Sequence, residues 1–160
     1  MRIGTGFDIH RFGPGDHVML GGVRIAHDRG VLAHSDGDVL LHALMDALLG
    51  AAGAGDIGLH FPPGDARFAG ADSTGLLLEV MKLVAARGFK VVNCDLTLIA
   101  EAPRIGLHRD AICTSVAVAL HVDRSQVNLK ATTAEGLGAL GRGEGIAAQA
   151  VVLLREGDGA

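Results

Sequence analysis

Apolar and polar residues alternate over residues 2–12, and this period of two predicts a β-strand. The odd-numbered positions, among them Phe7 and Ile9, would share one face. The even-numbered positions, among them Asp8 and His10, would share the other face, with these two about 7 Å apart along the strand. That spacing suits two ligands of one metal ion, whereas an exposed strand face is the plainer interpretation of the pair taken alone.

A nearly unbroken apolar run over residues 39–49 is typical of a buried helix. Ser35 or Asp36 is expected to cap its start, with Asp38 in the first turn, where a carboxylate favours the positive end of the helix dipole. Gly50 would end the helix.

The rest of the chain predicts further elements in a regular succession. Residues 17–20 and 23–25 form a hairpin pattern, 52–65 a loop, 73–88 and roughly 105–120 helices, and 89–100, 126–131 and 146–154 strands. Ser73 would cap the second helix, and residues 132–135 carry a capping signal for a short helical turn.

This succession predicts an α+β fold in which a mixed β-sheet has its helices packed on one face. We expect a single domain over residues 1–160, with a disordered tail from about residue 156. No further helix is predicted to cover the second face of the sheet. We therefore expect another copy of the chain to cover it, most simply in a closed ring.

Composition excludes several classes of function. Hydrophobic residues make up 49% of the 160 residues and charged residues 20%, which argues against disorder. The net charge of −4, with five Phe and no Trp or Tyr, gives no reason to expect nucleic acid. No apolar run reaches the ~18 residues of a membrane span. The two widely spaced cysteines, Cys94 and Cys113, are expected to be buried thiols in a reducing cytoplasm.

Candidate chemistry gathers around the buried helix. His42 lies four residues from Asp46, so the two share a helix face and need partners there. Asp8, His10 and His42 together form a set of two histidines and a carboxylate that suits zinc, manganese or iron. Asp46 is expected to orient the His42 ring by contacting it without binding the metal itself. For any one of these residues alone, an ordinary core or capping role remains the plainer interpretation.

Two predicted helix starts could bind phosphate. His34 lies beside backbone N–H groups expected to be free, and Thr132 and Thr133 add hydroxyl groups at a second helix start. Glu135 offers a carboxylate for a magnesium ion. A metal beside phosphate sites indicates phosphoryl chemistry.

Five motifs in register make a resemblance specific. They are Gly6-Phe7-Asp8-Ile9-His10-Arg11, His34-Ser35-Asp36-Gly37-Asp38 with His42, Gly55-Asp56-Ile57-Gly58, Lys130-Ala131-Thr132-Thr133-x-Glu135 and Gly141-Arg142-Gly143-Glu144-Gly145-Ile146. Together they resemble the 2-C-methyl-D-erythritol 2,4-cyclodiphosphate synthases of non-mevalonate isoprenoid biosynthesis, from Arg2 to about Leu154. Some members of that family are fused behind a cytidylyltransferase, and this chain looks like the monofunctional form.

The resemblance implies a phosphorus–oxygen lyase that converts 4-diphosphocytidyl-2-C-methyl-D-erythritol 2-phosphate to the cyclic diphosphate and CMP. It implies a cytoplasmic homotrimer whose sheets face a central channel. Zinc (or manganese) would bind Asp8, His10 and His42, and magnesium (or manganese) would bind Glu135. His34 and Thr133 would be catalytic. The implied substrate-binding residues are Ser35, Asp56, Gly58, Phe61, Asp65, Ala100, Pro103, Arg104, Ile105, Gly106, Ala131, Thr132 and Arg142.

Phe7 and Glu144, with Arg142, would line the channel, where an isoprenoid diphosphate could bind. An ion pair between Arg142 and Glu144 across a subunit boundary is the plainer interpretation of those two. The chain departs from the family pattern at Pro63, Arg104 and Ala139. These departures are expected to affect the affinity for substrate more than the reaction itself. Two alternatives stay open: a zinc phosphodiesterase acting on another nucleotide, and a non-catalytic trimer that binds an isoprenoid diphosphate.

Overall fold

A five-stranded mixed sheet forms the centre of the computed structural model, which describes residues 1–62, 64–68 and 70–157. The strand order is β4-β1-β7-β5-β6, with only β5 and β6 parallel to each other. The strands are β1 (Arg2–Gly13), β4 (Gly30–Val31), β5 (Phe89–Ile99), β6 (Val127–Thr132) and β7 (Gly145–Glu156).

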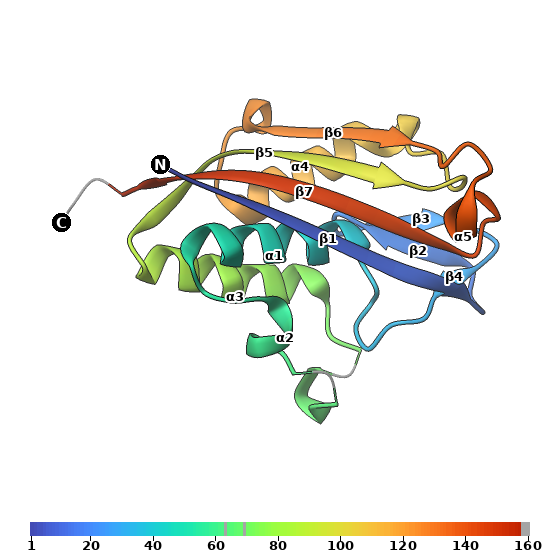
Figure 1. Ribbon diagram of the computed structural model, residues 1–160, viewed down its shortest axis with the longest axis horizontal. Helices are drawn as coiled ribbons and strands as arrows, with labels where there is room; N and C mark the ends of the chain where they lie inside the picture. Colours follow the sequence, from blue (N-terminus) through green and yellow to red (C-terminus); the bar gives the residue numbers. More distant parts are fainter. Residues whose placement is uncertain (63, 69, 158–160) are drawn as a thin grey trace.

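The three long helices lie together on one face of this sheet (Figure 1). They are α1 (Val39–Ala52), α3 (Ser73–Ala86) and α4 (Arg109–Leu120). A separate hairpin of β2 (His17–Leu20) and β3 (Val23–Ala26) packs near the start of α1. The predicted α+β class, with a mixed sheet and helices on one face, is confirmed.

Short helical turns complete the described part of the chain. They are α2 (Ile57–His60), α5 (Gly138–Gly141) and the 3₁₀ turns η1 (Ala66–Phe68), η2 (Gly106–His108) and η3 (Arg124–Gln126). The loop predicted over residues 52–65 therefore contains a helical turn, α2. Of the expected polar tail, Glu156 still belongs to β7, and residues 158–160 lie outside the described residues.

Helix α1 rests directly on β1 because β1 has no side chains at the crossing. A Cβ on Gly6 would lie 2.0 Å from the Ala43 carbonyl oxygen, and one on Gly4 would lie 2.0 Å from that of Ala47. Only glycine permits such an approach of two backbones. The crossing sets how close His42 comes to the residues that follow Gly6 on β1.

Three helix boundaries differ from the sequence predictions. Asp38, rather than Ser35 or Asp36, is the N-cap of α1, and the helix runs past Gly50 to a left-handed C-cap at Gly53. Asp72, rather than Ser73, caps α3. Asp and Ser are both good caps, so composition alone does not decide among neighbours.

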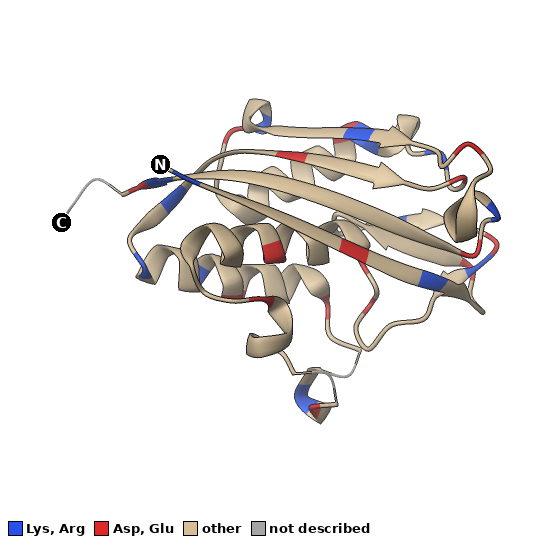
Figure 2. Ribbon diagram, in the orientation of Figure 1, with Lys and Arg blue, Asp and Glu red and all other residues tan. Residues whose placement is uncertain are grey.

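The outer face of the sheet exposes apolar side chains. Ile3, Phe7 and Ile9 are 70%, 56% and 51% exposed, and the strands carry few charges in Figure 2. Cys94 and Cys113 are buried free thiols, as predicted, and burial raises the pKa of Cys94 to about 12. Among the described residues, no helix is long and apolar enough to span a membrane.

Candidate functional site

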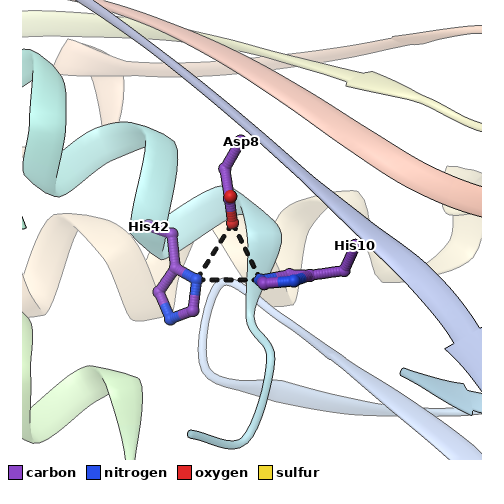
Figure 3. Close-up of side chains that lie close together, drawn as sticks. All are labelled: Asp8, His10 and His42. Atoms are coloured by element: carbon purple, nitrogen blue, oxygen red, sulfur yellow. Dashed lines mark hydrogen bonds and ion pairs between the residues drawn. The ribbon is translucent and has the colours of Figure 1, made fainter. Parts of the chain in front are cut away.

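Asp8, His10 and His42 meet where β1 crosses the start of α1 (Figure 3). The Asp8 Oδ2 atom lies 2.9 Å from His10 Nε2 and 2.9 Å from His42 Nδ1, and the two ring nitrogens are 3.0 Å apart. The three side chains are 22%, 16% and 9% exposed, respectively. The ligand set predicted from the sequence is therefore brought together.

Hydrogen bonds alone cannot satisfy this triangle. If both ring nitrogens donated to Asp8, their two N–H groups would oppose each other at 3.0 Å. If either nitrogen were unprotonated, its lone pair would face the carboxylate or the other ring. A divalent cation removes the conflict, because all three atoms are then ligands through lone pairs. The group could hold zinc, manganese or iron.

The charges of this group are coupled. Burial raises the pKa of Asp8, but hydrogen bonds and charge from His10 and His42 outweigh it and hold that pKa well below its usual value. For His42, burial lowers the pKa, but the hydrogen bond and charge of Asp8, together with the charges of Asp38 and Asp36, more than offset this and raise the pKa from its usual value. A metal ion binding here must displace the proton that Asp8 stabilises on His42.

Asp38 holds α1 in this position. Its fully buried carboxylate accepts hydrogen bonds from the backbone N–H groups of Leu41, Gly21 and Gly22, at 3.0, 2.9 and 2.7 Å. The first bond caps α1 and the other two tie the helix start to the turn between β2 and β3. Burial raises the pKa of Asp38, with the three N–H donors acting in the opposite direction.

The loop before α1 is already hydrogen-bonded within the chain. The N–H of Asp36 donates to the Ala71 carbonyl, that of Gly37 to Ser35 Oγ, and that of Asp38 to Asp36 Oδ1. The expectation of free N–H groups beside His34 is therefore wrong at these three positions. A phosphate there would depend on the side chains of His34 and Ser35 instead.

A cavity of about 280 Å³ opens in front of the metal group, and we call it the β1–α1 pocket. Asp8, His10, His34, Ser35, His42, Gly58, Phe61 and Asp65 are among its lining residues. Asp65 also pairs with Arg67 at 2.7 Å. Asp56 is not among the lining residues, because its carboxylate caps α2 by accepting from the Leu59 N–H.

Asp46 has a different partner from the one predicted. Its Oδ1 atom accepts a hydrogen bond from the Ile57 N–H at 2.8 Å, which ties α1 to the start of α2. The outer ring nitrogen of His42, Nε2, lies 3.0 Å from the hydroxyl groups of both Ser35 and Ser73. The sequence indicates a capping role for Ser73 but not this contact, because nothing local in the sequence connects residues 42 and 73.

A second cavity, of about 770 Å³, lies at the other edge of the sheet, and we call it the β5–β6 pocket. It collects nine predicted site residues: Ala100, Pro103, Arg104, Ile105, Gly106, Ala131, Thr132, Thr133 and Glu135. Thr132, Thr133 and Glu135 are all exposed. Arg104, one of the departures from the family pattern, is also exposed here.

The predicted helix start at Thr132 is wrong. Glu135 adopts a left-handed conformation (φ 52°), and the next helix, α5, begins only at Gly138. The Glu135 N–H donates to Thr133 Oγ1, whose hydroxyl donates to Glu135 Oε1 at 3.0 Å. The Ala134 N–H donates to Glu101 Oε1. The hydroxyl and carboxylate groups are present as predicted, but on a turn.

The two pockets are far apart within one chain. Ile9 pairs with Ala147, Ala147 with Ile99, and Ile99 with Thr132, so three strand spacings separate β1 from the end of β6. At about 4.8 Å for each spacing, that is about 14 Å. A single chain therefore does not join the metal group to Thr132, Thr133 and Glu135.

Four further residues singled out in the sequence lie outside both pockets. Arg142 and Glu144 form an ion pair at 2.7 Å within one chain, whereas the plainer interpretation of these two expects the pair between subunits. Phe7 lies on the exposed face of the sheet. Ala139 is exposed on α5, and Pro63 lies outside the described residues.

Comparison with known proteins agrees with this geometry. Residues 1–155 match the model of the YgbB family. Two curated relatives, from Xanthomonas axonopodis pv. citri and Chromohalobacter salexigens, are both named 2-C-methyl-D-erythritol 2,4-cyclodiphosphate synthase. Each is 60% identical to this chain over 96% of its length, and the chain covers 92% and 95% of them.

Solved structures share the fold as well. A 2C-methyl-D-erythritol-2,4-cyclodiphosphate synthase in a CDP-bound form is 44% identical, with a TM-score of 0.88 over 96% of this chain and 100% of its own. The CDP complex of IspF from Plasmodium falciparum is 35% identical, with a TM-score of 0.86 over 98% and 97%. The bifunctional IspDF from Campylobacter jejuni is 42% identical, with a TM-score of 0.93, and this chain spans 97% of itself but 42% of that protein. The chain therefore belongs to the YgbB family, the family of the cyclodiphosphate synthases that its motifs resemble.

Proposed function

We propose that this protein converts 4-diphosphocytidyl-2-C-methyl-D-erythritol 2-phosphate to 2-C-methyl-D-erythritol 2,4-cyclodiphosphate and CMP, as a phosphorus–oxygen lyase of isoprenoid precursor biosynthesis. The observation that carries the proposal is the triangle of Asp8, His10 and His42 on the wall of a pocket shared with His34 and Ser35. The names of relatives 60% identical to the chain support the choice of substrate.

The residues of the β1–α1 pocket suit this reaction. The substrate's own 2-phosphate is the nucleophile, and it is largely dianionic at pH 7 because its second pKa is about 6. No nucleophilic side chain or strong general base is then needed. A zinc ion on Asp8, His10 and His42 would offset the repulsion between the phosphates. His34 and Ser35 would bind and orient the phosphate that is attacked.

The β5–β6 pocket suits the nucleotide and the second cation. Ala100–Gly106 and Ala131 would hold the cytidine, in keeping with the CDP-bound structures of two similar proteins. Thr132 and Thr133 would donate their hydroxyl groups to the phosphates, with Thr133 acting on the transferring group. The Glu135 carboxylate would hold a magnesium ion, which would offset the negative charge of the diphosphate.

A homotrimer would complete the site. The strands that carry the two pockets lie about 14 Å apart in one chain, so we expect a substrate that uses both to take the β5–β6 pocket of a neighbouring copy. The exposed apolar residues Ile3, Phe7 and Ile9 give the sheet a face that another copy would cover around a central channel. Light scattering should give three times the mass of one chain, and Ile9→Asp should lower it; a wild-type monomer at micromolar concentration would contradict the trimer.

One assay tests the proposed reaction against its alternatives. The purified protein is incubated with the cytidylyl substrate, zinc and magnesium, and the products are followed by ³¹P NMR. CMP with a cyclic diphosphate supports the proposal. Linear phosphates would indicate a zinc phosphodiesterase instead. Absence of turnover, with an isoprenoid diphosphate bound near Phe7, would indicate a non-catalytic binding protein.

A further inference from the structure

We propose that Ser73 and Asp36 are positioning residues of the metal group. Through a chain of hydrogen bonds they hold the imidazole of His42 in the tautomer that presents the Nδ1 lone pair to the metal. This inference rests on the metal site of the proposed function. In this proposal, a residue of helix α3 and a residue of the loop before α1 hold the metal-ligating histidine in place.

The chain of contacts is continuous and enclosed. His42 Nε2 lies 3.0 Å from Ser73 Oγ, and that hydroxyl donates to Asp36 Oδ1 at 2.5 Å. The backbone N–H of Ser73 donates to the other carboxylate oxygen, Asp36 Oδ2, at 3.1 Å. Ser73 is completely buried, so water does not compete for its hydroxyl group.

The direction of each proton follows from the donor inventory. A serine hydroxyl has one proton, and an ionised carboxylate can only accept. Because Ser73 gives its proton to Asp36, its oxygen can only accept from His42. A ring whose Nδ1 lone pair is given to a metal then has its one proton on Nε2, where Ser73 accepts it. Nδ1 is the atom that lies 2.9 Å from Asp8 Oδ2 and 3.0 Å from His10 Nε2.

Ser35 also contacts His42 but cannot set the tautomer. Its Oγ lies 3.0 Å from the same ring nitrogen and accepts the N–H of Gly37. Its own proton is given to no carboxylate among the described residues, so this hydroxyl can either donate to the ring or accept from it. Ser35 is also partly exposed and lines the β1–α1 pocket. It is therefore free to turn toward a substrate, whereas Ser73 is not.

The same contacts tie the metal ligand to the loop proposed to bind phosphate. The Asp36 N–H donates to the Ala71 carbonyl, and the Gly70 N–H donates to the His34 carbonyl. The start of α3 thereby holds both His42 and the backbone beside His34. A metal-ligating histidine usually has such a partner on its second nitrogen, and losing it typically costs about 10- to 100-fold in metal affinity.

The test measures zinc binding and the Nε2–H proton of His42 directly. The variants are Ser73→Ala and Asp36→Ala, with Thr74→Ala as a control that removes a hydroxyl one residue further along α3. Ser73→Ala should weaken zinc binding about 10- to 100-fold in a chelator competition. In the zinc-loaded protein, ¹H–¹⁵N spectra should show the His42 Nε2–H proton exchanging slowly with water in the wild type and faster in Ser73→Ala. Thr74→Ala should match the wild type.

The double variant of Ser73 and Asp36 provides a second criterion. Because the two residues act in one chain, it should lose little more affinity than Ser73→Ala alone. If Ser73→Ala binds zinc as tightly as the wild type, the inference is wrong while the proposed function stands. If zinc binding depends on Ser73 but no CMP is released from substrate, the positioning role stands and the proposed function fails.

Discussion

The β1–α1 pocket and the β5–β6 pocket contain the two halves of the predicted site, and they are built very differently. In the first, Asp8, His10 and His42 are largely buried and lie within 3.0 Å of one another. In the second, Thr133 and Glu135 lie exposed on a turn and hydrogen-bond mainly to each other.

The difference indicates what each half can do without a partner. Three lone pairs held together by buried elements form a site that a metal can enter in one chain. Exposed hydroxyl and carboxylate groups on a turn become a site only when a ligand, a cation or another copy of the chain orders them. We therefore expect zinc binding to be a property of the β1–α1 half alone, and catalysis to require both halves.

The largest effect is expected from His42→Ala. It removes one of the three ligands, so the variant should lose its zinc, and turnover should fall about 10³-fold or more, since a metal contributes several kcal/mol to such a reaction. Metal content and CMP release are measured together. His121→Asn, a change at an exposed left-handed position outside both pockets, is the matched control. Retained turnover in a zinc-free His42→Ala protein would contradict the assignment.

Asp38→Ala should cost the most stability. It leaves three backbone N–H groups without their acceptor, at about 1 kcal/mol each, so the free energy of unfolding should fall by about 3 kcal/mol. Asp72→Ala removes the exposed cap of α3, whose carboxylate accepts one N–H, and should cost about 1 kcal/mol. Urea unfolding of both variants compares them. Equal losses in the free energy of unfolding would mean that the burial of Asp38 and its contacts to the hairpin add nothing to stability.

Gly6→Ala should damage the metal half by moving α1. The new Cβ would lie 2.0 Å from the Ala43 carbonyl oxygen, so the helix must shift, at about 2 kcal/mol and with weaker zinc binding. Gly50→Ala is the control on the same helix, because a Cβ there meets nothing within 4 Å, and it should stabilise the protein by up to ~1 kcal/mol. Unfolding and zinc titrations are compared, and unchanged zinc affinity in Gly6→Ala would show that the crossing does not place His42.

Glu135→Gln tests the exposed half alone. The amide keeps the shape but lacks the charge, so the magnesium concentration for half-maximal activity should rise about tenfold. Zinc content should stay that of the wild type. Glu79→Gln, at an exposed carboxylate paired with Lys82, is the control. A loss of zinc in Glu135→Gln would mean that the two halves are not independent.

The smallest effect is the pH dependence of zinc binding. Asp8 raises the pKa of His42 against the effect of burial. In the metal-free protein, the protonated His42 ring therefore stabilises the fold fully below the usual histidine pKa of about 6.5. This contribution is lost as the pH rises through the raised pKa of His42 in the folded protein. Zinc must displace that proton. Its affinity should therefore fall up to about tenfold for each pH unit below the raised pKa and level off above it. Chelator competition from acid to mildly alkaline pH measures this, and an affinity independent of pH would contradict the coupling.

The sequence by itself determined most of the elements and the three side chains that could hold a metal. The period of two along β1 put Asp8 and His10 on one face, and the apolar run over α1 made a buried His42 a residue in need of partners. These inferences succeed because they rest on geometry repeated every two to four residues, which any strand or helix imposes. The motif spacing also identified the family.

Tertiary structure decided which distant residues support those ligands. Asp38 caps α1 while binding Gly21 and Gly22, and Ser73 reaches His42 from 31 residues away. Asp46 turns to α2 instead of His42. Such hydrogen bonds depend on which elements pack against each other and on where water is excluded. A local sequence pattern predicts neither of these. The distance between the two pockets arises in the same way, because strand order rather than chain order sets how far Thr132 lies from β1.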